Sequence, residues 1–185
     1  MTAALLLLAL SPEPTLASQV KAKLVDAPVI TGTFEQSKQV KGFKRPLKSS
    51  GAYEVKKGAG VTWNTLKPFA SELSVTAAQI RSTQGGAEVF ALDAKTEPTV
   101  KVITTLLFSL LAGDLDALST HFTAQGGVDG ANWHIELTPK PGPLEKIFLR
   151  ISLKGDGYVR SVHLQEQSGD STLISLIPSP PRGEG

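Results

Sequence analysis

The sequence predicts an α+β protein that is mainly β, with about 10–11 antiparallel strands, one N-terminal helix and two central helices. Three observations lead to this fold class. Short runs rich in β-branched and aromatic residues recur between turns that contain glycine or proline. Several of these runs alternate apolar and polar residues, as expected for a sheet with one buried and one wet face. A long apolar segment with helical spacing divides the runs into two groups.

The length and composition indicate one domain that needs no covalent or metal crosslinks. With 185 residues, the chain can bury about two-thirds of the surface that it exposes when unfolded. It contains no cysteine, which excludes thiol nucleophiles, redox pairs and cysteine-bound zinc. The net charge is +2, and the basic residues are spread thinly among acidic ones, which argues against nucleic acid binding.

Residues 1–14 are predicted to form a secretory leader. The run Ala3–Leu10 is apolar but shorter than the ~20 residues that cross a bilayer. Ser11-Pro12 follows as a breaker. No lysine or arginine precedes the run, and an N-terminal core helix is the alternative interpretation.

A first helix is predicted from Thr15 to Asp26, because Leu16, Val20 and Leu24 share a helical face. Pro28 ends it, since a residue before proline disfavours the helical conformation. Strand-like runs follow at residues 29–36, 51–56, 61–65, 72–76, 80–83 and 89–92. The turns between them are closely spaced, which favours hairpins over helical crossovers.

Alternation assigns the faces of these strands. Tyr53 and Val55 point to one side of the sheet, opposite Glu54 and Lys56. Val61 and Trp63 likewise share a side. The predicted sheet therefore has an apolar face and a polar face.

Two helices are predicted in the middle of the chain. The first begins at Pro98 and stops at Gly113, and the second is capped by Asp114 and runs from Leu115 to Ser119. The longer helix is apolar over most of its circumference, so it must be covered on nearly all sides. It could lie inside a curved sheet, act as a lid over an apolar cavity, or belong to a thick core, and periodicity alone favours the thick core.

Strands resume after the helices. Runs are predicted at residues 121–123, 132–138, 147–153, 158–164 and 171–177, with a strong hairpin signal at Gly155-Asp156-Gly157. Residues 15–177 are predicted to form the single domain, and residues 178–185 have the composition of a disordered tail.

No catalytic or metal-binding constellation is recognisable. His121, His134 and His163 have no neighbours at metal-ligand spacing. No serine lies in a nucleophile elbow, and Asp114 and Asp116 are explained by helix capping. We therefore predict no catalytic residues, no metal and no cofactor.

An ordered set of residues in the N-terminal third resembles the outer-membrane lipoprotein carrier protein family (LolA-like), and the order of the predicted elements agrees over most of the chain. The set comprises Gly32-Thr33-Phe34-Glu35-Gln36, Gly51-Ala52-Tyr53, Gly60-Val61-Thr62-Trp63, Pro68 and Leu73-Ser74-Val75. The resemblance implies an open antiparallel half-barrel whose helices cover its concave face. It also implies a periplasmic carrier that holds acyl chains without changing them and moves them towards the outer membrane.

The resemblance places apolar side chains around a lipid cavity. The predicted lining residues are Phe34, Tyr53, Val55, Val61, Trp63, Leu73, Val75, Ile103, Leu106, Leu107, Leu110 and Leu111. The family carries a basic residue followed by proline at a position where this chain has Lys57-Gly58, while Arg45-Pro46 lies one element earlier. Lys57, Arg45 and Gly113 are therefore the candidates for a lid or latch.

The implied partners are an acylated cargo, an inner-membrane donor and an outer-membrane acceptor, with the carrier itself a monomer. Two other functions stay open at this point. One is a periplasmic sensor or scaffold that binds a protein partner through the edge of the sheet. The other is a hydrolase, which would need a catalytic pair that the sequence does not reveal.

Overall fold

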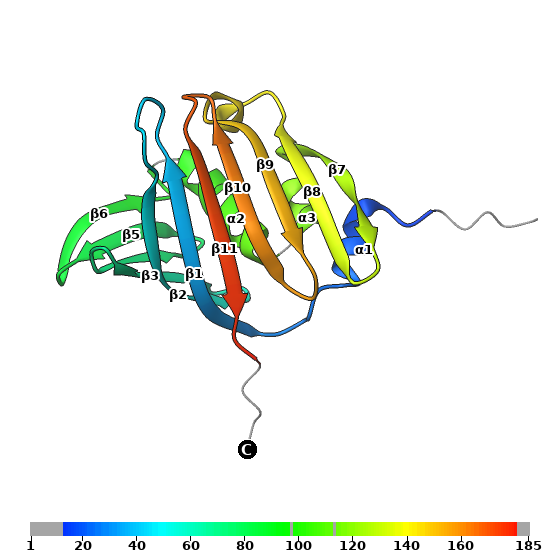
Figure 1. Cartoon of the computed structure of the whole chain (residues 1–185), viewed down its shortest axis with the longest axis horizontal. Coiled ribbons are helices and arrows are strands. Elements are labelled where there is room, and N and C mark those ends of the chain that lie inside the picture. The colour runs from blue at the N-terminus through cyan, green and yellow to red at the C-terminus, as the bar shows by residue number, and fades with distance from the viewer. Residues whose placement is uncertain (1–12, 97, 113, 181–185) are drawn as a thin grey trace, which may run out of the picture.

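The chain forms one curved antiparallel sheet of eleven strands around three helices (Figure 1). A computed structural model describes residues 13–180 except 97 and 113, without the side chains of 98–101, 103 and 112. The predicted leader lies mostly outside the described residues, as does Gly113. The strands are β1 (Val29–Gln39), β2 (Leu47–Lys56), β3 (Gly60–Lys67), β4 (Ser71–Val75), β5 (Gln79–Gln84), β6 (Ala87–Asp93), β7 (Phe122–Asp129), β8 (Asn132–Pro139), β9 (Phe148–Gly155), β10 (Val159–Glu166) and β11 (Ser171–Pro178).

The sheet is an open half-barrel, which confirms the predicted fold class. Its strand order is β6-β5-β4-β3-β2-β1-β11-β10-β9-β8-β7, so two meanders are joined where β1 pairs with β11. Strands β6 and β7 are its two edges, and among the described residues they do not pair with each other. The helices are α1 (Leu16–Lys21), α2 (Pro98–Ala112), α3 (Leu115–Leu118) and the short 3-10 turn η1 (Pro143–Lys146).

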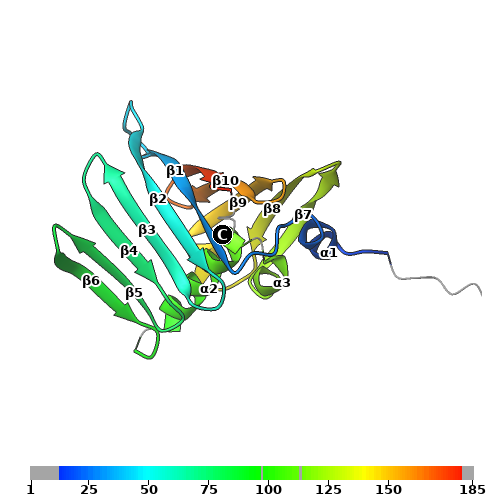
Figure 2. The ribbon, with the colours of Figure 1, turned by 90° about the horizontal axis from the view of Figure 1, so that it is seen from below.

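Helix α2 lies across the concave face of the sheet, with α3 beside it (Figure 2). It contacts β5, β10, β2 and α3. This arrangement explains why α2 is apolar around most of its circumference, since the curved sheet surrounds it. No helix in the described ranges is long and apolar enough to span a membrane.

Side chains from both meanders fill the space under α2. Phe34 of β1 is 1% exposed and stacks on Trp63 of β3, with 3.9 Å between the ring centroids. Leu106 and Leu110 of α2 are each 3% exposed. The predicted alternation is confirmed in β2, where Tyr53 and Val55 are buried. The concave face is thus a packed core over much of its area.

Tertiary contacts decide the bounds of α1 and β7, the two elements that differ most from their predicted bounds, while smaller differences include β2, which begins at Leu47 rather than at residue 51. Helix α1 ends at Lys21 rather than Asp26, and the Val25 amide donates to the Gly157 carbonyl at 2.8 Å instead of continuing the helix. Strand β7 continues to Asp129, although Gly126-Gly127 interrupts its alternation. Pairing with β8 maintains β7 at this point, where a Cβ on Gly126 would collide with the carbonyl of His134.

Candidate functional site

A cavity of about 500 Å³ opens at one end of the half-barrel. Its walls are α1, the segment between α1 and β1, the first residues of β1, the end of β2, and the junction of α2 with α3. The lining residues are Ala17, Lys21, Leu24, Val25, Asp26, Ala27, Ile30, Val55, Lys57, Gly58, Phe108, Ser109, Asp114, Leu115 and Asp116.

Apolar and charged side chains occupy different parts of this cavity. Val55 and Leu115 are buried, and Leu24, Ile30 and Phe108 are half-buried, so they form an apolar floor. The charged lining residues are all exposed and form a rim: Lys21, Asp26, Lys57, Asp114 and Asp116. An apolar floor with a polar rim suits an amphiphilic molecule, whose tail gains by leaving water while its head stays wet.

Residues 22–28, which we call the strap, form one wall of the cavity. At one end the Val25 amide donates to the Gly157 carbonyl in the β9–β10 turn. At the other end the Lys57 amide donates to the Pro28 carbonyl at 2.9 Å, and Lys57 Nζ lies 2.6 Å from Asp26 Oδ1. The strap is therefore attached to both meanders of the sheet, one on each side of the cavity.

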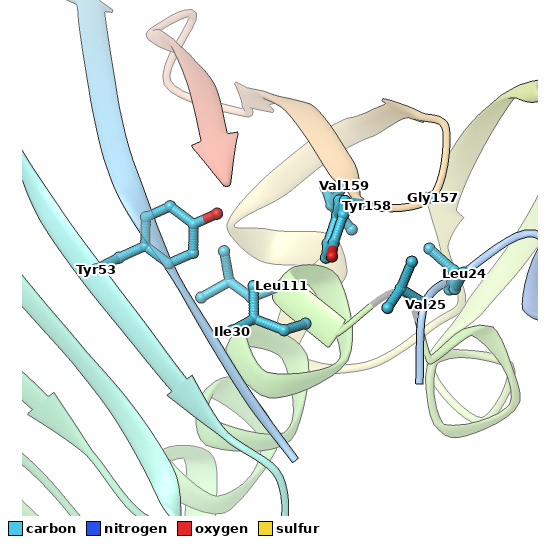
Figure 3. A pocket seen from close by; sticks show the side chains of 8 residues that line it. All are labelled: Leu24, Val25, Ile30, Tyr53, Leu111, Gly157, Tyr158 and Val159. Carbon is cyan, nitrogen blue, oxygen red and sulfur yellow. The ribbon is translucent and has the colours of Figure 1, made fainter. Parts of the chain in front are cut away.

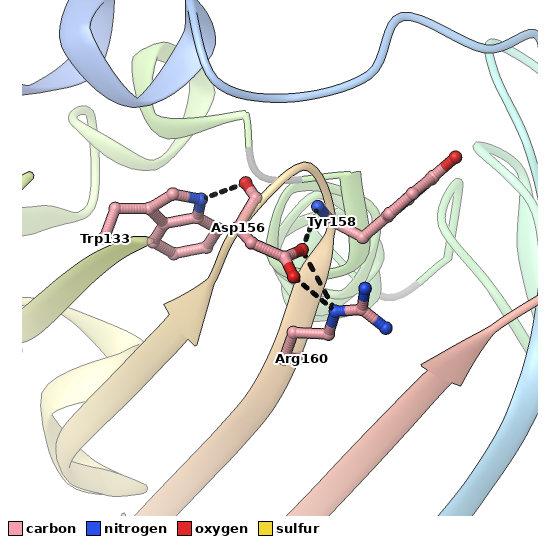
Figure 4. A network of polar contacts seen from close by, with 4 residues as sticks. All are labelled: Trp133, Asp156, Tyr158 and Arg160. Carbon is pink, nitrogen blue, oxygen red and sulfur yellow. Dashed lines mark hydrogen bonds and ion pairs between the residues drawn. The ribbon is translucent and has the colours of Figure 1, made fainter. Parts of the chain in front are cut away.

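A polar network fixes the turn that holds the strap (Figure 4). Asp156 accepts hydrogen bonds at 3.0 Å from the Tyr158 amide and from Nε of Arg160. The hydrogen bond from Arg160 holds the pKa of the Asp156 carboxyl below its ordinary value. Trp133 Nε1 donates to the Asp156 carbonyl at 2.7 Å. These bonds orient Gly157, whose carbonyl accepts from the strap.

A smaller cavity of about 10 Å³ adjoins the first one and shares Leu24, Val25 and Ile30 with it (Figure 3). Tyr53, Leu111 and the turn residues Gly157–Val159 complete its lining. Tyr53 is 5% exposed, and its burial raises the pKa of the phenol to about 12. The two cavities place the strap's apolar residues over the inner face of β2.

We expect Tyr53 to make stability depend on pH in alkaline solution. Because folding raises its pKa from 10.0 to about 12, folding favours the neutral phenol. That contribution is complete below pH 10 and is lost as the pH rises towards 12. The free energy of unfolding should therefore fall more steeply over this window for the wild type than for Tyr53→Phe. Parallel curves for the two proteins would contradict the burial of the phenol.

The structure separates the sequence-predicted lining residues into three groups. Val55 lines the larger cavity, and Tyr53 and Leu111 line the smaller one. A second group is buried in the core: Phe34, Val61, Val75, Leu106 and Leu110. A third group is partly buried against that core: Trp63, Leu73 and Leu107. The side chain of Ile103 lies outside the described residues.

The structure also separates the predicted latch residues. Strand pairing sets Val29 opposite Lys56 at one end of the β1–β2 ladder and Lys38 opposite Leu47 at the other. Lys57 follows the first of these ends, at the cavity rim, and Arg45 precedes the second. Lys57 therefore lies at the cavity rim, where it contacts Asp26 of the strap, and Arg45 lies at the opposite end of the ladder.

Sequence reasoning missed most of the cavity floor and all of the strap. Helical spacing places Leu24 on the apolar face of the first predicted helix, and the apolar character of α2 does not single out Phe108. Pro28 could have indicated the strap, because a proline disfavours helix in the residues before it and so leaves Leu24 and Val25 in a connecting segment. Asp26 had no signal, since its partner Lys57 is 31 residues away.

We expect the ion pair between Asp26 and Lys57 to lower the measured pKa of Asp26. The hydrogen bond and positive charge of Lys57 lower the Asp26 pKa below 3.8. In Lys57→Met the Asp26 pKa, followed by NMR, should rise towards 3.8. The stabilisation that the pair contributes is present above pH 3.8 and is lost as the pH falls through the lowered pKa. An unchanged Asp26 pKa in Lys57→Met would show that the pair does not form.

Within the described ranges, no three histidine, aspartate or glutamate side chains gather where they could hold a metal ion. The ionisable groups at the rim are all exposed. The chemistry that this arrangement supports is the shelter of an apolar group from water.

Comparison with known proteins gives a family match over most of the chain. The family model of the outer membrane lipoprotein carrier protein LolA matches residues 26–178. No curated protein matches the chain with significance.

Solved structures of three relatives are similar to the chain. A LolA superfamily protein from Nitrosomonas europaea has 7% identity and a TM-score of 0.47, covering 87% of this chain and 89% of its own. A DUF1329 family protein from Desulfovibrio piger has 14% identity and a TM-score of 0.49, with 92% of each chain covered. The MucA/MucB complex of Pseudomonas aeruginosa gives 14% identity and a TM-score of 0.45, covering 84% of this chain and 53% of the other.

Proposed function

The chain belongs to the LolA family of outer membrane lipoprotein carrier proteins, and from this premise we propose that it carries an acylated cargo, a lipoprotein or a related lipid. The cargo's acyl chains enter the apolar cavity, travel through the periplasm towards the outer membrane and leave unchanged. The protein acts as a monomer between an inner-membrane donor and an outer-membrane acceptor.

One observation carries this proposal, namely the cavity of about 500 Å³ with its apolar floor and charged rim. Its volume lies within the range of roughly 300–1,000 Å³ that is typical of small-molecule sites. Leu24, Ile30 and Phe108 offer apolar contacts from three separate elements. Such contacts are non-directional, and a carrier of varied acyl chains needs no more specific recognition.

Burial of the acyl chain supplies the affinity. Each methylene that leaves water contributes about 0.8 kcal/mol, so ten methylenes contribute roughly 8 kcal/mol before ordering costs. The exposed rim residues Lys21 and Asp116 remain available to the polar end of the cargo. No bond of the cargo has to break during loading or release.

Release requires a wall of the cavity to move, and the strap is our candidate because its residues 24–28 belong to no helix or strand. The amides of its first residues, 22–24, donate to carbonyls of α1, and its attachments to the sheet are two backbone hydrogen bonds and the exposed Asp26–Lys57 pair. Exposed ion pairs add little stability, so the strap can open at small cost. In this proposal Lys57 is the latch, in the place where the family carries a basic residue followed by proline.

The test is to extract protein that was purified without detergent into organic solvent and to identify the extract by mass spectrometry. Acyl lipid in stoichiometric amount is the expected result. The emptied protein should then bind a fluorescent fatty acid, and an unlabelled fatty acid should displace it. An empty extract together with no fatty acid binding would overturn the proposal.

A second candidate function is a periplasmic module that binds a protein partner at the edge of the sheet. The observation that favours it is edge strand β6, in which Ala87–Ala91 are all exposed, including Val89 at 59% and Phe90 at 42%. An exposed edge strand can pair with an extended segment of another chain. Stable capture of a protein partner by lipid-free protein, abolished by a proline at Val89, would support this function over carriage.

A further inference from the structure

The three most exposed large apolar side chains in the described part of the chain lie at one end of the sheet. They are Phe69 at 73%, Leu66 at 64% and Phe43 at 63%, and Leu47 at 59% lies between them along the chain. Phe43 is in the β1–β2 loop, and Phe69 is in the β3–β4 turn. Both connections follow strands that run in the same direction, so they project from the same end (Figure 2). We call residues 40–48 and 66–70 the tip.

The tip is strongly basic. Residues 36–53 contain five cationic side chains and no aspartate or glutamate, and Lys67 adds a sixth cation from the next hairpin. The near-neutral charge of the whole chain conceals this local excess, which the overall composition did not reveal. The cationic residues of this end are Lys38, Lys41, Lys44, Arg45, Lys48 and Lys67.

Acidic residues of the β10–β11 hairpin contact Lys38 and the Lys41 amide, but they form no ion pair with the cations nearest the exposed aromatic rings. Glu166 lies 3.4 Å from Lys38 Nζ, and Asp170 accepts a hydrogen bond from the Lys41 amide at 2.9 Å. These contacts tie the hairpin to the β10–β11 turn. Lys44, Arg45, Lys48 and Lys67 form no ion pair with other residues that the structure describes.

We propose that the tip binds the surface of an anionic lipid bilayer. Phe43 and Phe69 enter the interfacial layer, where aromatic rings are favoured, while the surrounding cations pair with lipid phosphates. Exposed apolar residues are costly in water unless something covers them, and the positive charge selects a negative surface. The exposed aromatic rings and the cations lie together at the tip, which projects from the sheet and can contact a flat bilayer.

This surface is separate from the acyl cavity. Strand pairing puts Val29 and Lys56 at the cavity end of the β1–β2 ladder, and Lys38 and Leu47 at the tip end. Bilayer binding therefore does not require cargo, and the inference stands even if the proposed carrier function fails. It gives a carrier a means of staying at a membrane while the cavity and strap stay accessible.

The test is co-sedimentation of the full chain with vesicles of phosphatidylcholine, with and without one-quarter phosphatidylglycerol. We expect binding to the anionic vesicles that 0.5 M salt abolishes, and little binding to the neutral ones. Lys44→Gln/Arg45→Gln should weaken binding about 25-fold, at about fivefold per charge. Phe43→Ser/Phe69→Ser should weaken it roughly tenfold or more.

Control variants remove exposed cations and an exposed apolar side chain at the other end of the sheet. Lys23→Gln/Lys154→Gln removes two exposed cations, and Ile177→Ser removes a side chain that is 57% exposed. These variants should bind like the wild type, as should the cavity variant Phe108→Glu. Equal binding to anionic and neutral vesicles, or an equal effect of the tip and control variants, would overturn the proposal.

Discussion

Replacing Phe108 with glutamate should abolish acyl binding while the protein stays folded. Phe108 is half-buried on α2 and forms part of the cavity floor, together with Leu115 of α3 and Val55 of β2. Removing its ring forfeits roughly 1.5–3 kcal/mol of apolar contact, and a carboxylate in the floor adds the cost of desolvating a charge. Together these predict a loss of affinity for a fluorescent fatty acid of at least about 30-fold at neutral pH.

The matched control for this variant is Leu173→Glu. Leu173 lies in β11 and is 44% exposed. It points to the opposite face of the sheet from its buried neighbour Thr172. The same change of an apolar residue to glutamate there should leave fatty acid affinity unchanged. If Phe108→Glu and Leu173→Glu bind alike, the cavity described here is not where the acyl chain sits.

Replacing Phe34 with alanine should cost about 3–5 kcal/mol of folding stability, the range measured for buried phenylalanines. Phe34 is 1% exposed and its ring stacks on Trp63. Its strand β1 pairs with both β2 and β11 and so joins the two meanders. Urea denaturation followed by tryptophan fluorescence measures this loss, and the emission of Trp63 in the native state should also change when its stacking partner is removed.

Phe43→Ala is the corresponding control, because Phe43 is the same residue type at 63% exposure. Its free energy of unfolding should change by less than about 0.5 kcal/mol. A small loss for Phe34→Ala, comparable with that of Phe43→Ala, would mean that the concave face around Phe34 is loosely filled and available to ligand. That outcome would move the binding site from the rim cavity into the middle of the half-barrel.

The fold could be predicted because strand alternation and turn residues are local signals. Tyr53, Val55, Val61 and Trp63 alternate with polar residues, and they share the inner face that the sequence assigned to them. Strand β7 was only partly predicted, since Gly126-Gly127 has no side chains with which to alternate and its conformation depends on pairing with β8.

The candidate site was harder to predict because apolar residues at a cavity and in a core have the same periodicity. On α2, Leu106 and Leu110 belong to the core, whereas Phe108 and Leu111 line the cavities. The sequence placed Leu106 and Leu110 in the cavity lining, where glutamate would reduce acyl uptake without unfolding the protein. Both side chains are only 3% exposed, so a glutamate at either position would bury a charge in the core and should unfold the protein.

The strap could not be predicted from local patterns. Its attachments join Val25 to Gly157 and Asp26 to Lys57, and both contacts exist only after the two meanders have folded around α2. The resemblance to the carrier family did identify Lys57 as a candidate latch. It did not identify the acidic partner, Asp26, which the sequence places at the end of the predicted first helix.

A crystal structure of the protein with a bound C16 fatty acid would show whether an acyl chain occupies the cavity. We expect elongated density along the floor between Leu24, Ile30 and Phe108, with the carboxylate near the rim at Lys21 or Lys57. A second cavity of about 450 Å³ is lined by residues that include Trp133, His134 and Lys154. Density in that second cavity, or no bound fatty acid at saturating concentration, would contradict the proposal.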